Sequence, residues 1–348
     1  SVCGALTFLI LFLLFGHKLL YLLGGRDDIL QQSYAYCSIL FFGGLLLWLS
    51  GSLSAALRGM GNMRFPATLM IVASFLQVIL SGGFILGWYG FPKFGVSGAA
   101  IATLISSSLM VSIILIKLFG KSVPARLKRS QFILSKKLFS NIFEVAIPAS
   151  ASPLLTVGTI LVLTGLVGTF GTEALAGYGI GSRVEFLMIP LIFGIGTAMT
   201  SIVGANIGAN NIERAETVGI YGGSTAGIVS IFIGLTLALF PDLWIQYFTN
   251  DPKAFEVTKT YIQLVGPFYI FQGVGLSLYF ASQGANAMKW PTIATVARFL
   301  IASIGGSVSV YWLGLGIESI FLSSSIAMMI FGVTIFISIK RGAWRKAS

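Results

Sequence analysis

Residues 95–118, GVSGAAIATLISSSLMVSIILIKL, form an apolar run whose single charged side chain, Lys117, lies next to its end. A helix that crosses the hydrocarbon core of a bilayer needs about 20 mostly apolar residues. This run is long enough, and no Asp or Glu interrupts it. The segment is therefore predicted to span the membrane as a helix.

The same pattern recurs along the whole chain. Strands are disfavoured in these runs, because lipid cannot satisfy the hydrogen bonds of an open sheet edge. We therefore predict an all-α polytopic membrane protein. Its ten predicted spans are residues 2–23, 33–57, 66–89, 95–118, 142–170, 175–204, 217–240, 256–281, 291–313 and 317–339.

The composition supports a chain that is solvated by lipid. Hydrophobic residues make up 56% of the sequence and charged residues only 9%, whereas a soluble domain has about 25% charged residues. The net charge is +11, but the basic residues lie in short segments between apolar runs. Because positive charge in membrane proteins collects in cytoplasmic loops, the expected partner is the bilayer and not nucleic acid.

The basic segments also predict an orientation. Residues 121–137 contain six basic residues and no acidic one, and four more basic residues follow residue 339. If the spans alternate, both segments lie on one side, and the loops that hold Asp27, Glu173 and Asp242 lie on the other. The basic side is expected to be cytoplasmic. This predicts a multi-pass protein of the inner membrane with both ends of the chain in the cytoplasm.

An internal repeat predicts two pseudo-symmetric helical bundles. Residues 58–66, RGMGNMRFP, read closely against residues 283–291, QGANAMKWP, at an offset of 225 residues. Such repeats are a recurring architecture of transporters. The offset pairs the last four spans with the first four and leaves the fifth and sixth without partners. We therefore expect twelve spans in the intact protein, of which ten are visible here, and an N-terminal truncation.

The repeat also divides the chain. Residues 1–118 are predicted to form an N-lobe that lacks its first two helices. Residues 119–140 are predicted to be a basic cytoplasmic linker loop. Residues 141–348 are predicted to form a C-lobe with six spans and a basic cytoplasmic tail.

Three motifs carry a resemblance to a known family. They are ALRGMGNMRFP at 56–66, GVSGAAIAT at 95–103 and VGANIGANNIERA at 203–215. In this order and spacing, and within a two-lobed repeat, the sequence resembles the multidrug and toxic compound extrusion (MATE) family. The resemblance implies a secondary antiporter that exports amphipathic organic cations, drugs or metabolites in exchange for H⁺ or Na⁺ by alternating access. We expect a small-molecule substrate and a monomer.

The sequence departs from the family in its carboxylates. Family members commonly place coupling carboxylates on the first helix of the N-lobe, or on the seventh and tenth helices. The seventh and tenth helices correspond here to residues 142–170 and 256–281, which contain no Asp or Glu in their membrane-embedded parts. The ion-coupling residues must therefore be sought elsewhere.

Glu185 is the clearest ion-coupling candidate, because it lies near the middle of span 175–204. An ionisable side chain inside the bilayer is costly and marks a functional site by default. Arg183 is a second candidate, but residues two apart on a helix point to different faces. Arg298, inside span 291–313, is the alternative partner, through a salt bridge between helices of the C-lobe. A purely structural ion pair, or snorkelling of Arg298 to the headgroups, would also explain these residues.

Uncharged polar residues within the spans are candidates for the substrate cleft. Gln272, Tyr279 and Gln283 are spaced by seven and four residues, which keeps them on one helical face. Such a stripe could hold an organic cation through aromatic faces. Hydrogen bonding between helices is the competing explanation. The complete set of cleft candidates is Tyr178, Tyr269, Gln272, Tyr279 and Gln283, with Gln77 from the N-lobe.

Several other functions are disfavoured. His17 is the only histidine, so clustered catalytic residues and metal sites are not expected, and neither is a cofactor other than the coupling ion. The sequence has no Gly-Lys-Ser/Thr motif for an ATP-driven pump. A flippase for lipid-linked saccharides, with the same architecture, remains the first alternative, and a polytopic membrane enzyme the second.

Overall fold

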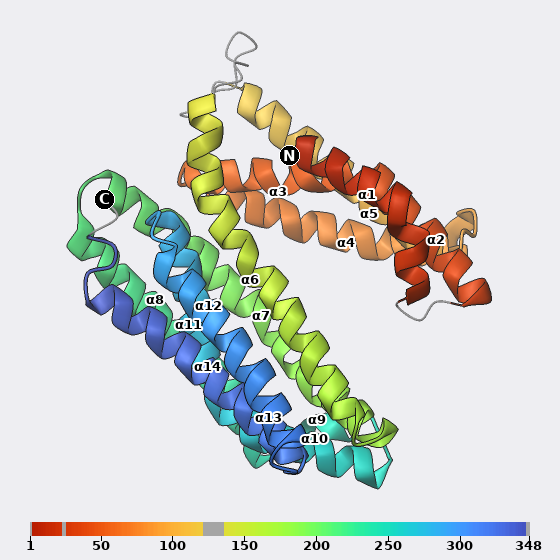
Figure 1. The fold of residues 1–348 in the computed structure, drawn as a ribbon. Helices are drawn as coiled ribbons and strands as arrows, with labels where there is room; N and C mark the ends of the chain where they lie inside the picture. Colours follow the sequence, from red (N-terminus) through yellow and green to blue (C-terminus); the bar gives the residue numbers. More distant parts are fainter. Residues whose placement is uncertain (1, 23–25, 121–135, 346–348) are drawn as a thin grey trace. The chain divides into compact units, whose positions relative to one another are not determined.

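The computed structural model describes residues 2–22, 26–120 and 136–345, and every regular element in these ranges is a helix (Figure 1). The contacts divide the chain into two compact units, Ser1–Ile133 and Leu134–Ser348. We describe each unit by itself.

The first unit contains five long helices. They are α1 (Val2–Leu22), α2 (Asp27–Phe42), α3 (Gly44–Gly59), α4 (Arg64–Leu86) and α5 (Val96–Phe119), with a short 3₁₀ turn at Trp88–Gly90. The predicted span 33–57 corresponds to two helices, since α2 and α3 bend by 51° at Gly43. Adjacent glycines, here Gly43 and Gly44, are a known cause of sharp kinks.

The second unit begins with α6 (Lys136–Gly168), α7 (Thr172–Gly208), α8 (Ile212–Leu239) and the single turn α9 (Asp242–Ile245). It continues with α10 (Pro252–Val265), the 3₁₀ turn Gly266–Phe268, α11 (Tyr269–Gly284) and α12 (Lys289–Leu300). A π-helical turn, Ile301–Gly305, leads into α13 (Gly306–Tyr311), and α14 (Ile317–Lys340) follows. Helix α6 already begins within the predicted linker loop 119–140, and residues 121–135 of that loop lie outside the described residues.

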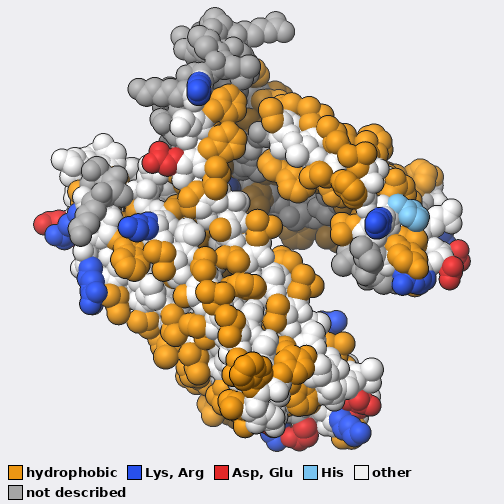
Figure 2. Space-filling view, viewed as in Figure 1, with side chains coloured by type: hydrophobic (Ala, Val, Ile, Leu, Met, Phe, Trp, Pro, Cys, Tyr) orange, Lys and Arg blue, Asp and Glu red, His pale blue; other side chains and the backbone are white. Residues whose placement is uncertain are grey.

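The described helices confirm the all-α membrane class. Nine helical spans among the described residues are long and apolar enough to cross a bilayer: seven single helices and the continuous runs Pro252–Gly284 (α10 to α11) and Lys289–Tyr311 (α12 to α13). The bent α2–α3 pair would make a tenth span. Figure 2 shows hydrophobic side chains over the flank of the second unit, with charged side chains gathered towards its ends. This distribution is expected of helices that face hydrocarbon along their length and water at their ends.

The helix boundaries repeat at the offset that the sequence predicts. Adding 225 to the first residues of α2, α3 and α4 gives the first residues of α10, α11 and α12. At the same offset, the break at Gly43 corresponds to Phe268, the last residue of the 3₁₀ turn Gly266–Phe268. Each unit therefore contains a helix that is interrupted at the equivalent position and is followed by an equivalent helix junction.

Helix α11 lies at the centre of the second unit, where it packs against α7, α8 and α14. The turn that precedes α11 meets α8 at Gly234 and Gly266, where a methyl group on Gly234 would collide with the Gly266 backbone. Small residues allow this close helix approach in lipid. The contact fixes the position of α10 and α11, which carry several of the polar residues discussed below.

Replacing Gly234 by Leu is expected to destabilise the second unit by about 1–3 kcal/mol, because the backbone of the Gly266 turn must move to make room. Thermal unfolding of the purified protein in detergent measures the effect. Gly165→Leu on α6 is the matched control, since a methyl group there would meet nothing within 4 Å. Equal unfolding midpoints for the two variants would contradict the proposed role of the α8–α11 contact.

Candidate functional site

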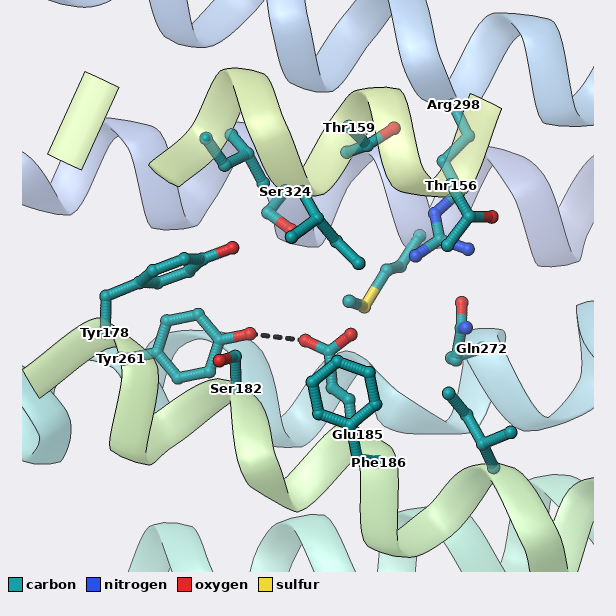
Figure 3. Close-up of a pocket in the computed structure, with 14 residues that line it drawn as sticks. Thr156, Thr159, Tyr178, Ser182, Glu185, Phe186, Tyr261, Gln272, Arg298 and Ser324 are labelled. Atoms are coloured by element: carbon teal, nitrogen blue, oxygen red, sulfur yellow. Dashed lines mark hydrogen bonds between the residues drawn. The ribbon is translucent and has the colours of Figure 1, made fainter. Parts of the chain in front are cut away.

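A small polar cavity lies inside the second unit, among helices α6, α7, α10, α11, α12 and α14 (Figure 3). Its volume is about 80 Å³. Its polar lining residues are Thr156, Thr159, Tyr178, Ser182, Glu185, Tyr261, Gln272, Arg298 and Ser324. We call it the Glu185 pocket.

Glu185 projects from α7 into the middle of the pocket, where the Tyr261 hydroxyl of α10 donates a hydrogen bond to its Oε1 (Figure 3). Gly181, one turn earlier on α7, leaves room for this tyrosine, since a side chain there would collide with the Tyr261 ring. The ring is held edge-on against Phe321 and Tyr178, with centroids 5.0 and 5.5 Å away. The phenol therefore approaches the carboxylate from a fixed direction.

Arg298 reaches the same pocket from α12, opposite Glu185 (Figure 3). The predicted salt bridge is not formed, because the ion pairs among the described residues include none within 4.0 Å between Glu185 and Arg298. The guanidinium instead lies 5.5 Å from the centroid of the Phe331 ring. Glu185 and Arg298 nevertheless line the same pocket, from α7 and α12. The space between them is open to water or to a ligand.

Gln272 of α11 contributes a side-chain carbonyl oxygen that accepts no hydrogen bond. Its side chain is only 6% exposed, and its Oε1 has no hydrogen-bond partner in the structure. An unsatisfied buried acceptor costs about 1–3 kcal/mol. A cavity needs only about 10–15 Å³ to hold one water molecule. The pocket therefore has both room and hydrogen-bonding groups for a few water molecules beside Glu185.

Three other predicted site residues, Tyr178, Tyr269 and Arg183, lie in or near the Glu185 pocket or face away from it. Tyr178 lines the pocket. Tyr269 is fully buried next to it, and its hydroxyl has no hydrogen-bond partner in the structure. Arg183 points away, on the exposed face of α7, with its guanidinium 5.4 Å from the Phe248 ring centroid. The helix geometry thus separates Arg183 from Glu185, as the spacing of two residues predicts.

The other cleft candidates do not join this pocket. The Tyr279 hydroxyl donates to the Ala149 carbonyl at 2.7 Å and ties α11 to α6. Gln283 lies at the end of α11, outside the pocket lining. Gln77, in the first unit, donates to Thr103 Oγ1 at 2.9 Å and joins α4 to α5. Tyr279 and Gln77 therefore form hydrogen bonds between helices, the competing explanation for such residues.

Sequence reasoning missed the most direct partner of Glu185. Tyr261 lies inside the predicted span 256–281, eleven residues before Gln272, but it was not among the polar residues singled out in that span. The hydroxyl groups of Thr156, Thr159, Ser182 and Ser324 were also missed, since Ser and Thr are common in membrane helices. A neighbouring carboxylate on another helix leaves no signal in the sequence of either helix.

The sequence of the chain is similar to those of known proteins. The MatE family model matches residues 1–82 and 148–308, which is more than half of the chain. A probable multidrug resistance protein NorM of Thermotoga maritima is 28% identical over 330 residues, covering 92% of this chain and 69% of that protein. An FAD transporter of Shewanella oneidensis is 24% identical, covering 93% and 71%. For a probable multidrug resistance protein of Bacillus subtilis, YoeA, the identity is 24% and the chain spans 62% of its length.

Solved structures show the same fold. An outward-facing multidrug resistance MATE family transporter of the MOP superfamily matches with a TM-score of 0.89 at 24% identity, covering 99% of this chain and 77% of that one. A MOP superfamily transporter from Pyrococcus furiosus matches with a TM-score of 0.89 at 23% identity, covering 98% and 76%. Together with the family match and the apolar helices, these comparisons show that the chain belongs to the MatE family of multi-pass membrane transporters.

Proposed function

We propose that the protein is a secondary antiporter that exports amphipathic organic cations, drugs or metabolites in exchange for protons. The observation that carries the proposal is Glu185, an ionisable side chain midway along a membrane helix, hydrogen-bonded by Tyr261 in a polar pocket. Carboxyl groups inside the membrane mark ion and proton pathways. The names of the relatives, multidrug resistance proteins and an FAD transporter, support drugs and metabolites as substrates.

The size of the Glu185 pocket favours an ion site over a substrate site. Pockets for drug-sized molecules measure about 300–1,000 Å³, whereas this cavity measures about 80 Å³. It has room for a proton and a few waters but not for an organic cation. We therefore assign Tyr178 and Gln272, which were cleft candidates, to the surroundings of the coupling group.

The charges in the pocket favour H⁺ over Na⁺. A bound Na⁺ would sit between Glu185 and the permanently charged guanidinium of Arg298, which repels it. A proton instead binds the carboxylate itself and needs no shell of oxygen ligands. Protonation would leave Glu185 neutral, and deprotonation would be stabilised by Tyr261 and Arg298. The pocket can therefore switch between two charge states without admitting a metal ion.

The rival flippase has less support. A site for a lipid-linked pyrophosphate needs an excess of positive charge, but the Glu185 pocket has one basic and one acidic side chain among its described lining residues. We further propose a monomer in the inner membrane, with the basic end of the second unit in the cytoplasm, on the basis of the basic segments described above.

Transport measurements with separate ion gradients test the proposal. In vesicles that contain the protein, an imposed pH gradient is expected to drive accumulation of a cationic dye, and an equal Na⁺ gradient at constant pH is expected to drive none. Vesicles treated with a protonophore are the control for the pH arm. Dye accumulation that follows the Na⁺ gradient alone would overturn proton coupling but would still be consistent with antiport. Dye accumulation in the absence of both gradients would overturn antiport.

A further inference from the structure

A second groove lies on the outside of the second unit, between the start of α12 and the end of α14. It measures about 380 Å³, a volume within the usual range for small-molecule sites. Its walls include Trp290 of α12, Thr334, Ile337 and Ser338 of α14, and Arg341 directly after α14. We propose that this α12–α14 groove binds an anionic phospholipid of the surrounding bilayer.

The lining of the groove changes from apolar to cationic along α14. Ile337 and Trp290 expose 41% and 44% of their surface on its walls. Ser338 and Arg341 follow at the end of the helix. An acyl chain fits the apolar part, and a phosphate group fits the cationic part. Tryptophan is enriched where the hydrocarbon core meets the headgroups, which is the depth that this arrangement requires.

The charge at this end of the groove is complementary to an anionic headgroup. Arg341 is exposed and takes part in no ion pair recorded among the described residues. Lys340, directly before Arg341, and Lys289, directly before Trp290, are also exposed. None of the described residues that line the groove is acidic. The nearby carboxylate of Glu216, on α8, is held by Arg345 at 2.7 Å. Basic pockets between membrane helices bind anionic lipid headgroups.

A neighbouring apolar groove extends the site. It lies between α8, α11 and α14, measures about 290 Å³ and is lined by residues such as Ile228, Phe271 and Val274. Val333, which is 36% exposed, lines both grooves. The two grooves therefore meet along one edge of α14, which provides a place for each of the two acyl chains of a phospholipid.

Quenching of Trp290 by brominated lipids tests the proposal. The protein is reconstituted into phosphatidylcholine vesicles that contain either brominated phosphatidylglycerol or brominated phosphatidylcholine, and the Trp290 signal is taken as the difference between the wild type and Trp290→Phe. Brominated phosphatidylglycerol is expected to quench this signal at lower mole fraction. Because each basic side chain near the surface contributes about fivefold to anionic lipid binding, Arg341→Ala is expected to reduce the preference about fivefold.

Two further variants separate a specific site from lipid that merely surrounds the protein. Thr334→Phe keeps the charge but fills the groove, and it is expected to abolish the preference. Lys253→Ala removes an exposed cation from the first turn of α10, outside the groove, and is expected to leave the preference unchanged. Equal quenching by the two lipids in the wild type would overturn the proposal, and so would a preference that survives both Arg341→Ala and Thr334→Phe.

Discussion

Proton-driven dye accumulation is expected to fall by about 100-fold or more when Glu185 is replaced by Gln, because the amide can neither bind nor release a proton inside the bilayer. Glu185 is the one acidic residue among the described residues that line its pocket. The pocket therefore has no second carboxylate among these residues that could bind and release a proton in place of Glu185. The measurement is the initial rate of dye accumulation in vesicles with an imposed pH gradient.

Two further variants make this result specific. Glu173→Gln makes the same substitution at an exposed position in the first turn of α7, and it is expected to transport normally. Tyr261→Phe removes the hydrogen bond to Glu185 but keeps the ring, and the loss should be smaller, about tenfold for one hydrogen bond to a charged group. Normal proton-driven transport by Glu185→Gln would exclude this residue as the coupling group.

Replacing Trp344 by Ala is expected to destabilise the second unit by about 3–5 kcal/mol, the usual cost of removing a fully buried aromatic side chain. Trp344 follows the last helix, yet its side chain is 0% exposed. Its indole N–H donates to Ser282 Oγ at 3.2 Å. The adjacent Arg345 forms two hydrogen bonds with Glu216, at 2.9 and 2.7 Å. The residues after α14 are thus fastened to both α11 and α8.

Thermal unfolding in detergent, followed by near-ultraviolet circular dichroism, measures this destabilisation. Trp312→Ala is the matched control, because Trp312 is 86% exposed and its removal leaves no cavity. Trp344→Phe should fall between the two, since it keeps most of the buried area and loses the hydrogen bond. A Trp344→Ala midpoint equal to that of Trp312→Ala would show that the segment after α14 does not anchor the unit.

The fold was largely predictable, because hydrocarbon imposes a strong length and composition requirement on each spanning helix. The ten predicted spans correspond to nine continuous helical spans and one bent pair among the described residues. The repeat between residues 58–66 and 283–291 located equivalent helix junctions in the two units. The bend at Gly43 was not predicted, since hydropathy measures how apolar a segment is and carries no information about its direction.

The candidate site was predictable only in part. Glu185 and Arg298 were identified because a charge inside a membrane helix is costly wherever it points. Their salt bridge was predicted wrongly, because hydropathy does not fix the rotation of one helix against another. Gln272 and Gln283 do share a face of α11, but eleven residues of helix separate them by about 16 Å. Of these two residues only Gln272 lines the Glu185 pocket, and Gln283 lies at the end of α11, outside it.

Direct measurement of proton exchange tests the central claim, that Glu185 carries the proton that is exchanged for substrate. Vesicles containing the wild-type protein or Glu185→Gln are loaded with a cationic substrate and diluted into weakly buffered medium, and the external pH is recorded as substrate leaves. In the wild type, substrate efflux is expected to draw protons into the vesicles and to make the medium alkaline. In Glu185→Gln no such change is expected. Equal alkalinisation by the two proteins would contradict the assignment of Glu185.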